Sequence, residues 1–127
     1  MFDRLTAYQP YLLSLLRIVA ALVLFSYGTQ KILGFPLVER VPPVMSMPWI
    51  AGVFELVCGF LVLIGLFTRP AAFLLSGVMA SAYFIGHFPK GFFPAQNGGV
   101  AAILFCFIFL YLVFSGPGPL SIDARRR

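Results

Sequence analysis

Few side chains in this sequence could do chemistry, and four of them stand inside long apolar runs. Tyr27 and Lys31 are one helical turn apart, Glu55 lies in the next apolar run, and His87 is the only histidine of the chain. An ionisable side chain at membrane depth is costly, so it usually faces a partner, a bundle interior or a water pocket. These four residues are therefore candidates to bind a ligand.

Two interpretations of these residues stay open. Lys31 and Glu55 form either a structural ion pair that fixes the register of the first two helices, or part of a polar pocket for a small ligand or a proton relay. His87 is either an interfacial histidine or a proton donor or acceptor for a ligand head group. Tyr27 is either a packing residue or a ligand contact.

Small residues share helical faces with these candidates. Gly52, Glu55 and Gly59 have the spacing i, i+3 and i+7, and Gly28 stands one turn before Lys31. Small residues let helices approach closely in membranes, so we expect the three glycines to be packing positions. Similar stripes run through the first and third apolar runs: Ser14, Arg17, Ala21, Leu24, Gly28 and Lys31, and Ser76, Ala80, Tyr83 and His87. We expect the three stripes to surround one pocket in the outer half of a bilayer.

The composition indicates a membrane protein. Of 127 residues, 61% are hydrophobic and 10% are charged, whereas soluble domains carry about 25% charged residues. The surplus apolar surface suits a lipid bilayer. The net charge of +5 does not indicate a nucleic-acid partner, because the basic residues stand singly except for a run at 125–127.

No cofactor or metal site is indicated by the motifs of the chain. Cys58 and Cys106 lie in apolar runs without CxxC spacing, so no metal site is expected. A phosphate-binding loop, a dinucleotide-binding glycine pattern and paired histidines for haem are all missing from the sequence.

Four apolar runs approach the length of about 20 residues that a membrane-spanning helix needs. They cover about residues 11–33, 48–67, 70–88 and 98–115, and glycines and prolines interrupt the chain between them. Because lipid cannot satisfy backbone polar groups, such runs are helical. We therefore predict an all-α fold, a four-transmembrane-helix antiparallel bundle that forms a single domain over residues 1–127.

The basic residues predict how the chain is oriented. Four spans place both termini on one side, together with Arg4, Arg69 and the run 125–127, whereas Lys31, Arg40 and Lys90 belong to the other side. The positive-inside rule then puts both termini in the cytoplasm, and the expected location is a bacterial-type inner membrane. Arg17, about 10 Å from the inner end by helical rise, is expected to snorkel to the cytoplasmic surface.

Several short motifs, in order, resemble the DoxX family of small four-helix membrane proteins, over residues 15–124. They are Gly28-Thr29-Gln30-Lys31, Glu55 with Gly59, residues 65–72, Met79 with Ala82 and His87, Gly91-Phe92-Phe93, Asn97-Gly98-Gly99, and residues 116–123. An acidic residue often follows Asn-Gly-Gly in that family, whereas this chain has Val100. If that acid lines the pocket, the ligand or proton chemistry differs here.

The resemblance implies a redox- or stress-associated role, with a quinone or similar small apolar molecule bound near Tyr27, Lys31, Glu55 and His87. One branch of the family is similar to the small subunits of a thiosulfate–quinone oxidoreductase. Electron transfer needs a cofactor, so the chain is not expected to be an enzyme on its own, and a partner redox subunit is implied. The alternatives are a non-catalytic scaffold or assembly subunit, and a small-molecule carrier that works as a homo-oligomer.

Overall fold

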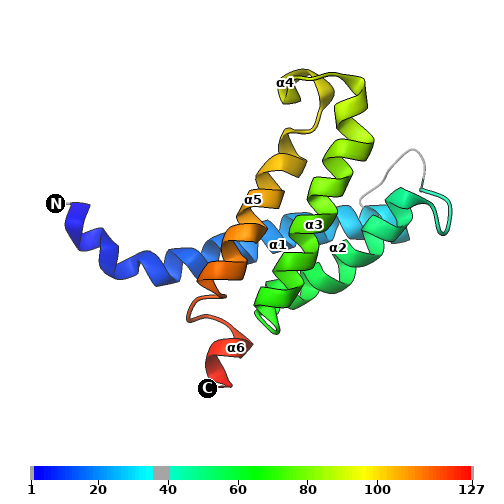
Figure 1. The fold of residues 1–127 in the computed structure, drawn as a ribbon. Helices are drawn as coiled ribbons and strands as arrows, with labels where there is room; N and C mark the ends of the chain where they lie inside the picture. Colours follow the sequence, from blue (N-terminus) through cyan, green and yellow to red (C-terminus); the bar gives the residue numbers. More distant parts are fainter. Residues whose placement is uncertain (1, 36–40, 127) are drawn as a thin grey trace.

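The computed structural model describes residues 2–35 and 41–126, and these residues are helical apart from their connections (Figure 1). Pro36, Arg40 and Arg127, which bear on the predicted loop and orientation, lie outside the described residues. In chain order the elements are η1 (Phe2–Tyr8), α1 (Gln9–Leu33), α2 (Met47–Ile64), α3 (Thr68–Ala82), η2 (Tyr83–His87), η3 (Phe88–Lys90), α4 (Pro94–Asn97), α5 (Val100–Ser115) and α6 (Ile122–Arg125). η1 and η3 are 3-10 segments, and η2 is a π-helical turn that continues α3.

Glycine and proline set most helix boundaries. Ser46 caps α2 by accepting a hydrogen bond from the Trp49 amide at 3.4 Å. Gly34 and Gly65 end α1 and α2 with φ of 72° and 75°, a left-handed conformation that glycine adopts without a steric penalty. Because Gly65 stops α2 there, α2 is shorter than the run 48–67, and α3 already begins at Thr68.

The predicted fold class is confirmed. Within the described residues, three helical segments are long and apolar enough to cross a membrane: Phe2–Leu33, Met47–Ile64 and Thr68–Lys90. α5 is apolar but has only 16 residues, about 24 Å of helix, less than the roughly 30 Å of a hydrocarbon core. The chain is therefore an all-α membrane protein with three long spans and a shorter fourth helix.

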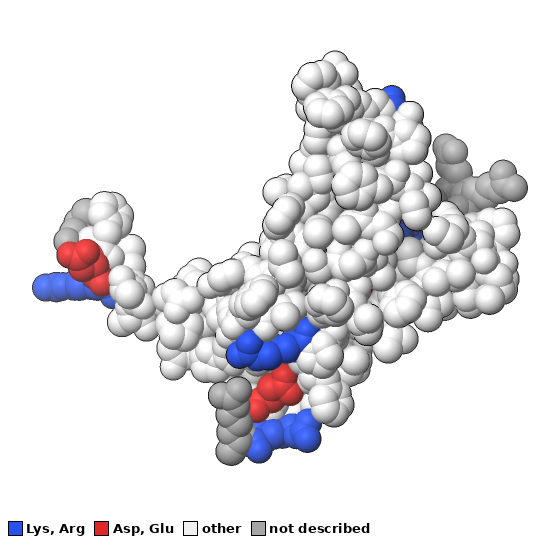
Figure 2. Space-filling view, in the orientation of Figure 1, with Lys and Arg blue, Asp and Glu red and all other residues white. Residues whose placement is uncertain are grey.

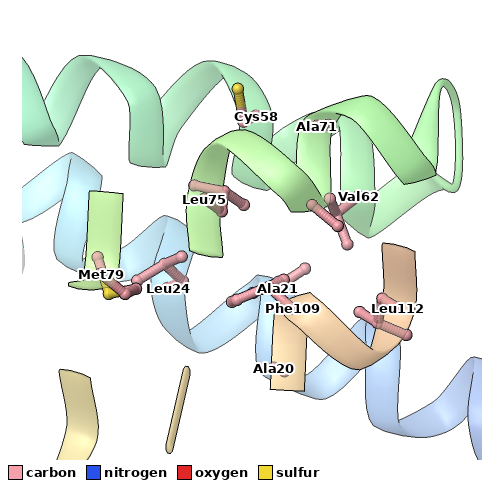
Figure 3. Packing of buried hydrophobic residues seen from close by; sticks show 11 residues of the cluster. Ala20, Ala21, Leu24, Cys58, Val62, Ala71, Leu75, Met79, Phe109 and Leu112 are labelled. Atoms are coloured by element: carbon pink, nitrogen blue, oxygen red, sulfur yellow. The ribbon is translucent and has the colours of Figure 1, made fainter. Parts of the chain in front are cut away.

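The helices pack as two antiparallel pairs. α1 lies against α2, α3 lies against α5, and α2 joins the pairs through its contact with α3. The two pairs cross in Figure 1, so α1 and α5 touch each other much less. Figure 3 shows the apolar core at this crossing, where Leu24, Leu75 and Phe109 are almost completely buried.

The remaining apolar side chains cover the outside of the helices. In Figure 2 almost the whole visible surface is uncharged, and most of the visible charged groups gather at the N-terminal tip and around the C-terminal segment. Exposed positions include Phe60, Phe73, Leu104 and Phe114. Such a surface suits lipid rather than water.

Arg17 does not snorkel to a surface, so that expectation is wrong. It is only 1% exposed, and its guanidinium donates hydrogen bonds to the carbonyl oxygens of Pro117, of Leu120 at 2.7 Å and of Leu63 at 3.4 Å. The segment that follows α5 brings unpaired carbonyl groups to α1, and a guanidinium with five donors satisfies several of them at once. Arg17 is thus a buried anchor for the C-terminal segment.

Candidate functional site

A buried ion pair joins α1 to α2. Lys31 Nζ lies 2.9 Å from Glu55 Oε1 and 3.2 Å from Oε2. The Glu55 side chain is 2% exposed and that of Lys31 is 27% exposed. The carboxylate is therefore enclosed, while the ammonium retains a path to the surroundings.

Two glycines allow the helices to come this close. A Cβ on Gly28 would lie 2.9 Å from the Leu56 amide nitrogen, and one on Gly52 would lie 2.9 Å from Lys31 Cβ. Gly59 differs, since a Cβ there would lie 3.6 Å from Phe25, an ordinary contact. The ion pair thus depends on a close approach of backbones at Gly28 and Gly52.

The π turn η2 and the loop before α5 fix the position of His87. Asn97, 4% exposed, donates to the Tyr83 hydroxyl at 3.1 Å and to the Gly91 carbonyl at 2.9 Å. Its own side-chain oxygen accepts from the Gly99 amide at 2.8 Å. His87 Nδ1 lies 3.2 Å from the carbonyl oxygen of Asn97. Because a carbonyl only accepts, a hydrogen bond between these atoms requires a hydrogen on Nδ1, an arrangement that in an uncharged imidazole leaves Nε2 as an acceptor.

A cavity of about 250 Å³ brings the four predicted residues together. Tyr27 and Lys31 reach it from α1, Glu55 from α2 and His87 from η2. The rest of its wall is apolar or small: Leu24, Met79, Ala82, Gly98, Ala101, Ala102 and Phe105. π turns occur often at functional sites, and here one of them supplies the histidine.

The polar groups of this cavity complement a carbonyl or a hydroxyl group. An ammonium carries three donors, so Lys31 can hold both oxygens of Glu55 and still donate to one ligand atom. Tyr27, 42% exposed, packs edge-on against Phe105 with ring centroids 6.4 Å apart. Its hydroxyl both donates and accepts. Among residues 2–35 and 41–126, no three His, Cys, Asp or Glu side chains lie close enough together to share a metal ion.

Sequence reasoning placed Tyr83 on a stripe facing the pocket and Asn97 in a family motif, but it did not predict the hydrogen bond by which the two organise this end of the molecule. A signal was present, because asparagine before glycine is typical of turns in which the side chain bonds nearby backbone. Val100, the departure from the family pattern, is 47% exposed and is not part of the cavity wall.

Apolar spanning helices around a small polar cavity define a compact multi-span membrane protein. The chain belongs to the DoxX family, whose sequence profile matches residues 12–88.

Relatives match over most of its length. An uncharacterized protein of Haemophilus influenzae is 46% identical, with 97% of this chain and 96% of that protein covered. The inner membrane protein YphA of Escherichia coli is 29% identical, with 94% and 93% covered. An uncharacterized membrane protein of Mycobacterium tuberculosis is 33% identical, with 87% and 78% covered. No solved structure shows significant similarity to the chain.

Proposed function

We propose that this DoxX-family protein binds a quinone, or a similar small apolar molecule with carbonyl or hydroxyl groups, in the polar cavity. Its place would be the bacterial inner membrane, as the similarity to YphA over 94% of the chain suggests. The redox- or stress-associated role rests on the family resemblance.

The observation that carries the proposal is the convergence of Tyr27, Lys31, Glu55 and His87 on one cavity of a protein that is otherwise apolar. Ligand sites are typically apolar hollows with a few placed polar groups. A quinone ring fits the wall formed by Leu24, Met79 and Phe105. Lys31 donates to one oxygen of the ligand, and His87 Nε2 accepts from a hydroxyl when the ligand is reduced.

The chain supplies binding and proton-exchanging groups. Electron transfer would need a redox cofactor, which we assign to a partner subunit. In that arrangement the cavity holds the ring while Glu55, Lys31 and His87 exchange protons with its oxygens.

Native mass spectrometry of protein released from mild detergent, with organic extraction, tests the proposal. We expect stoichiometric quinone in the parent protein and its loss in Glu55→Gln and Lys31→Met. Lys90→Met and Asp3→Asn are matched controls, because both residues are exposed and neither lines the cavity. Equal quinone content in the parent and in folded cavity variants would reject the proposal.

A scaffold function is the second candidate, and the Lys31–Glu55 pair favours it because it bridges two helices. In that case the same variants lower the stability of the protein and its recovery with a partner chain, with no effect on any ligand. Chains that co-purify with the protein are identified in the same spectra.

A further inference from the structure

A second hollow opens beside the cavity, between α2 and the α3–η2 helix. Its volume is about 560 Å³, within the range of sites for small molecules. Apolar side chains dominate its wall, among them Ala51 and Phe54 of α2 and Phe73 and Val78 of α3. Phe54 and Phe73 are 37% and 62% exposed, so the groove lies on the lipid-facing side of the two helices.

The groove adjoins the polar cavity. Lys31, Ala82 and His87 line both hollows, so the two polar side chains stand where apolar groove and polar cavity meet. A molecule that reached Lys31 and His87 from the lipid would pass along the groove.

Two glycines line the groove beside open space. Gly77 of α3 and Gly86 of η2 are both in its wall, and among the described residues no atom beyond the adjacent residues and the helix's own backbone lies within 4 Å of a Cβ built on either glycine. Neither glycine has a positive φ. Backbone conformation therefore does not require them, and the room beside them is free for a bound molecule.

We propose that the groove holds the hydrocarbon tail of the ligand whose polar head lies in the cavity, and that this ligand enters sideways from the bilayer. The ligand class is then an amphiphile with a carbonyl- or hydroxyl-bearing ring and a long aliphatic or isoprenoid chain. This inference rests on the proposed function, since the cavity must bind the head. It adds the tail site and the direction of entry.

The test compares two benzoquinones with the same head, one with a long isoprenoid tail and one with a methyl group. Each is incubated with the protein in lipid nanodiscs, and retained ligand per protein is measured at equal ligand-to-lipid ratios. Gly77→Phe fills the groove. Val57→Phe adds the same ring to an exposed position of α2 that lines neither hollow.

We expect Gly77→Phe to lower retention of the long-tailed quinone about tenfold, the effect of a moderate steric clash. Gly77→Phe should not change the retention of the methyl quinone, and Val57→Phe should not change the retention of either quinone. Lys31→Met should lower retention of both.

Other results would overturn the inference. If Gly77→Phe changes the retention of neither quinone while Lys31→Met lowers the retention of both, the head site stands and the groove holds only bulk lipid chains. If Gly77→Phe lowers the retention of both quinones equally, the groove does not bind the tail specifically. If the parent protein retains neither quinone, the proposed function fails as well, and the tail site fails with it.

Discussion

Glu55 is a carboxylate enclosed by protein and, within the described part of the chain, held by a single side chain, the Lys31 ammonium at 2.9 Å. Removing one member of a buried ion pair leaves the other charge without compensation and costs about 3–5 kcal/mol. Removing both charges avoids most of that penalty. The contribution of the pair to stability is therefore measured by comparing the free energy of unfolding of the single variants with that of the double variant.

We predict that Lys31→Met lowers the unfolding temperature in mild detergent, and that the double variant Lys31→Met with Glu55→Gln recovers most of the loss. Thermal unfolding followed by circular dichroism measures both. Lys90→Met, at an exposed position, is expected to unfold as the parent does. A double variant that is no more stable than the single one would show that Glu55 does not depend on Lys31.

At the scale of elements, α1 and α2 approach most closely at glycines that have no room for a methyl group. A Cβ on Gly28 would press on the Leu56 backbone nitrogen at 2.9 Å, and backbone cannot move aside as a side chain can. A Cβ on Gly59 would make an ordinary contact with Phe25 at 3.6 Å. The two glycines look alike in sequence and differ in geometry.

Gly28→Ala should therefore separate α1 from α2 and destabilise the protein by about 1–3 kcal/mol, the usual cost of overpacking. Gly59→Ala should be neutral or slightly stabilising, because alanine favours helix. Denaturation in detergent at neutral pH measures both. The packing interpretation would be wrong if Gly28→Ala were as stable as Gly59→Ala.

The link between α2 and α3 is held by the C-terminal segment. Asp123 Oδ1 accepts from the Phe67 amide at 3.0 Å, and Oδ2 accepts from the Thr68 amide at 2.9 Å. Burial alone raises the pKa of the Asp123 carboxyl, but these backbone hydrogen bonds and the nearby Arg126 outweigh it and lower the pKa below its ordinary value. The charge also favours the amino-terminal end of α3.

We predict that Asp123→Asn destabilises the protein by about 1 kcal/mol at neutral pH, since it removes the charge and one acceptor oxygen. Because the folded-state pKa is lowered, the contribution of Asp123 is complete above its unfolded pKa of about 3.9. It is lost as the pH falls from there through the lowered pKa. Stability measured against pH should show the parent and the variant converging in acid. A constant difference at all pH values would contradict this assignment.

The sequence predicted the four main helices and a polar face on the first three, because helical periodicity alone places Glu55 with Gly52 and Lys31 with Gly28. Long apolar runs made the all-α membrane fold a direct consequence of composition. The role of Arg17 could not be predicted, since its carbonyl partners at Pro117 and Leu120 are 100 and 103 residues away in the chain. The groove escaped prediction because it depends on the angle and distance at which α3 lies against α2, which the length of their link does not determine.

At the scale of the whole molecule, the two ends differ in charge. One end holds the C-terminal segment with Arg125 and Arg126, and Arg69, which donates to the Val113 and Phe114 carbonyls. The opposite end holds Lys90 and Lys31, but the charge of Lys31 is paired with Glu55. Among residues 2–35 and 41–126, which leave out Arg40, positive charge without a carboxylate partner is therefore concentrated at the C-terminal end. The orientation itself stays a prediction of the positive-inside rule.

We predict that the C-terminal end faces the cytoplasm. Arg125→Cys and Lys90→Cys, both at exposed positions, are made separately in a chain that carries Cys58→Ala and Cys106→Ala, so that each has one thiol. A membrane-impermeant thiol reagent added to spheroplasts should label Lys90→Cys at once, and Arg125→Cys only after the membrane is opened. The reverse pattern would place the polar cavity near the cytoplasmic surface. Labelling of both variants in sealed spheroplasts would mean that the chain inserts in both orientations, against the charge rule.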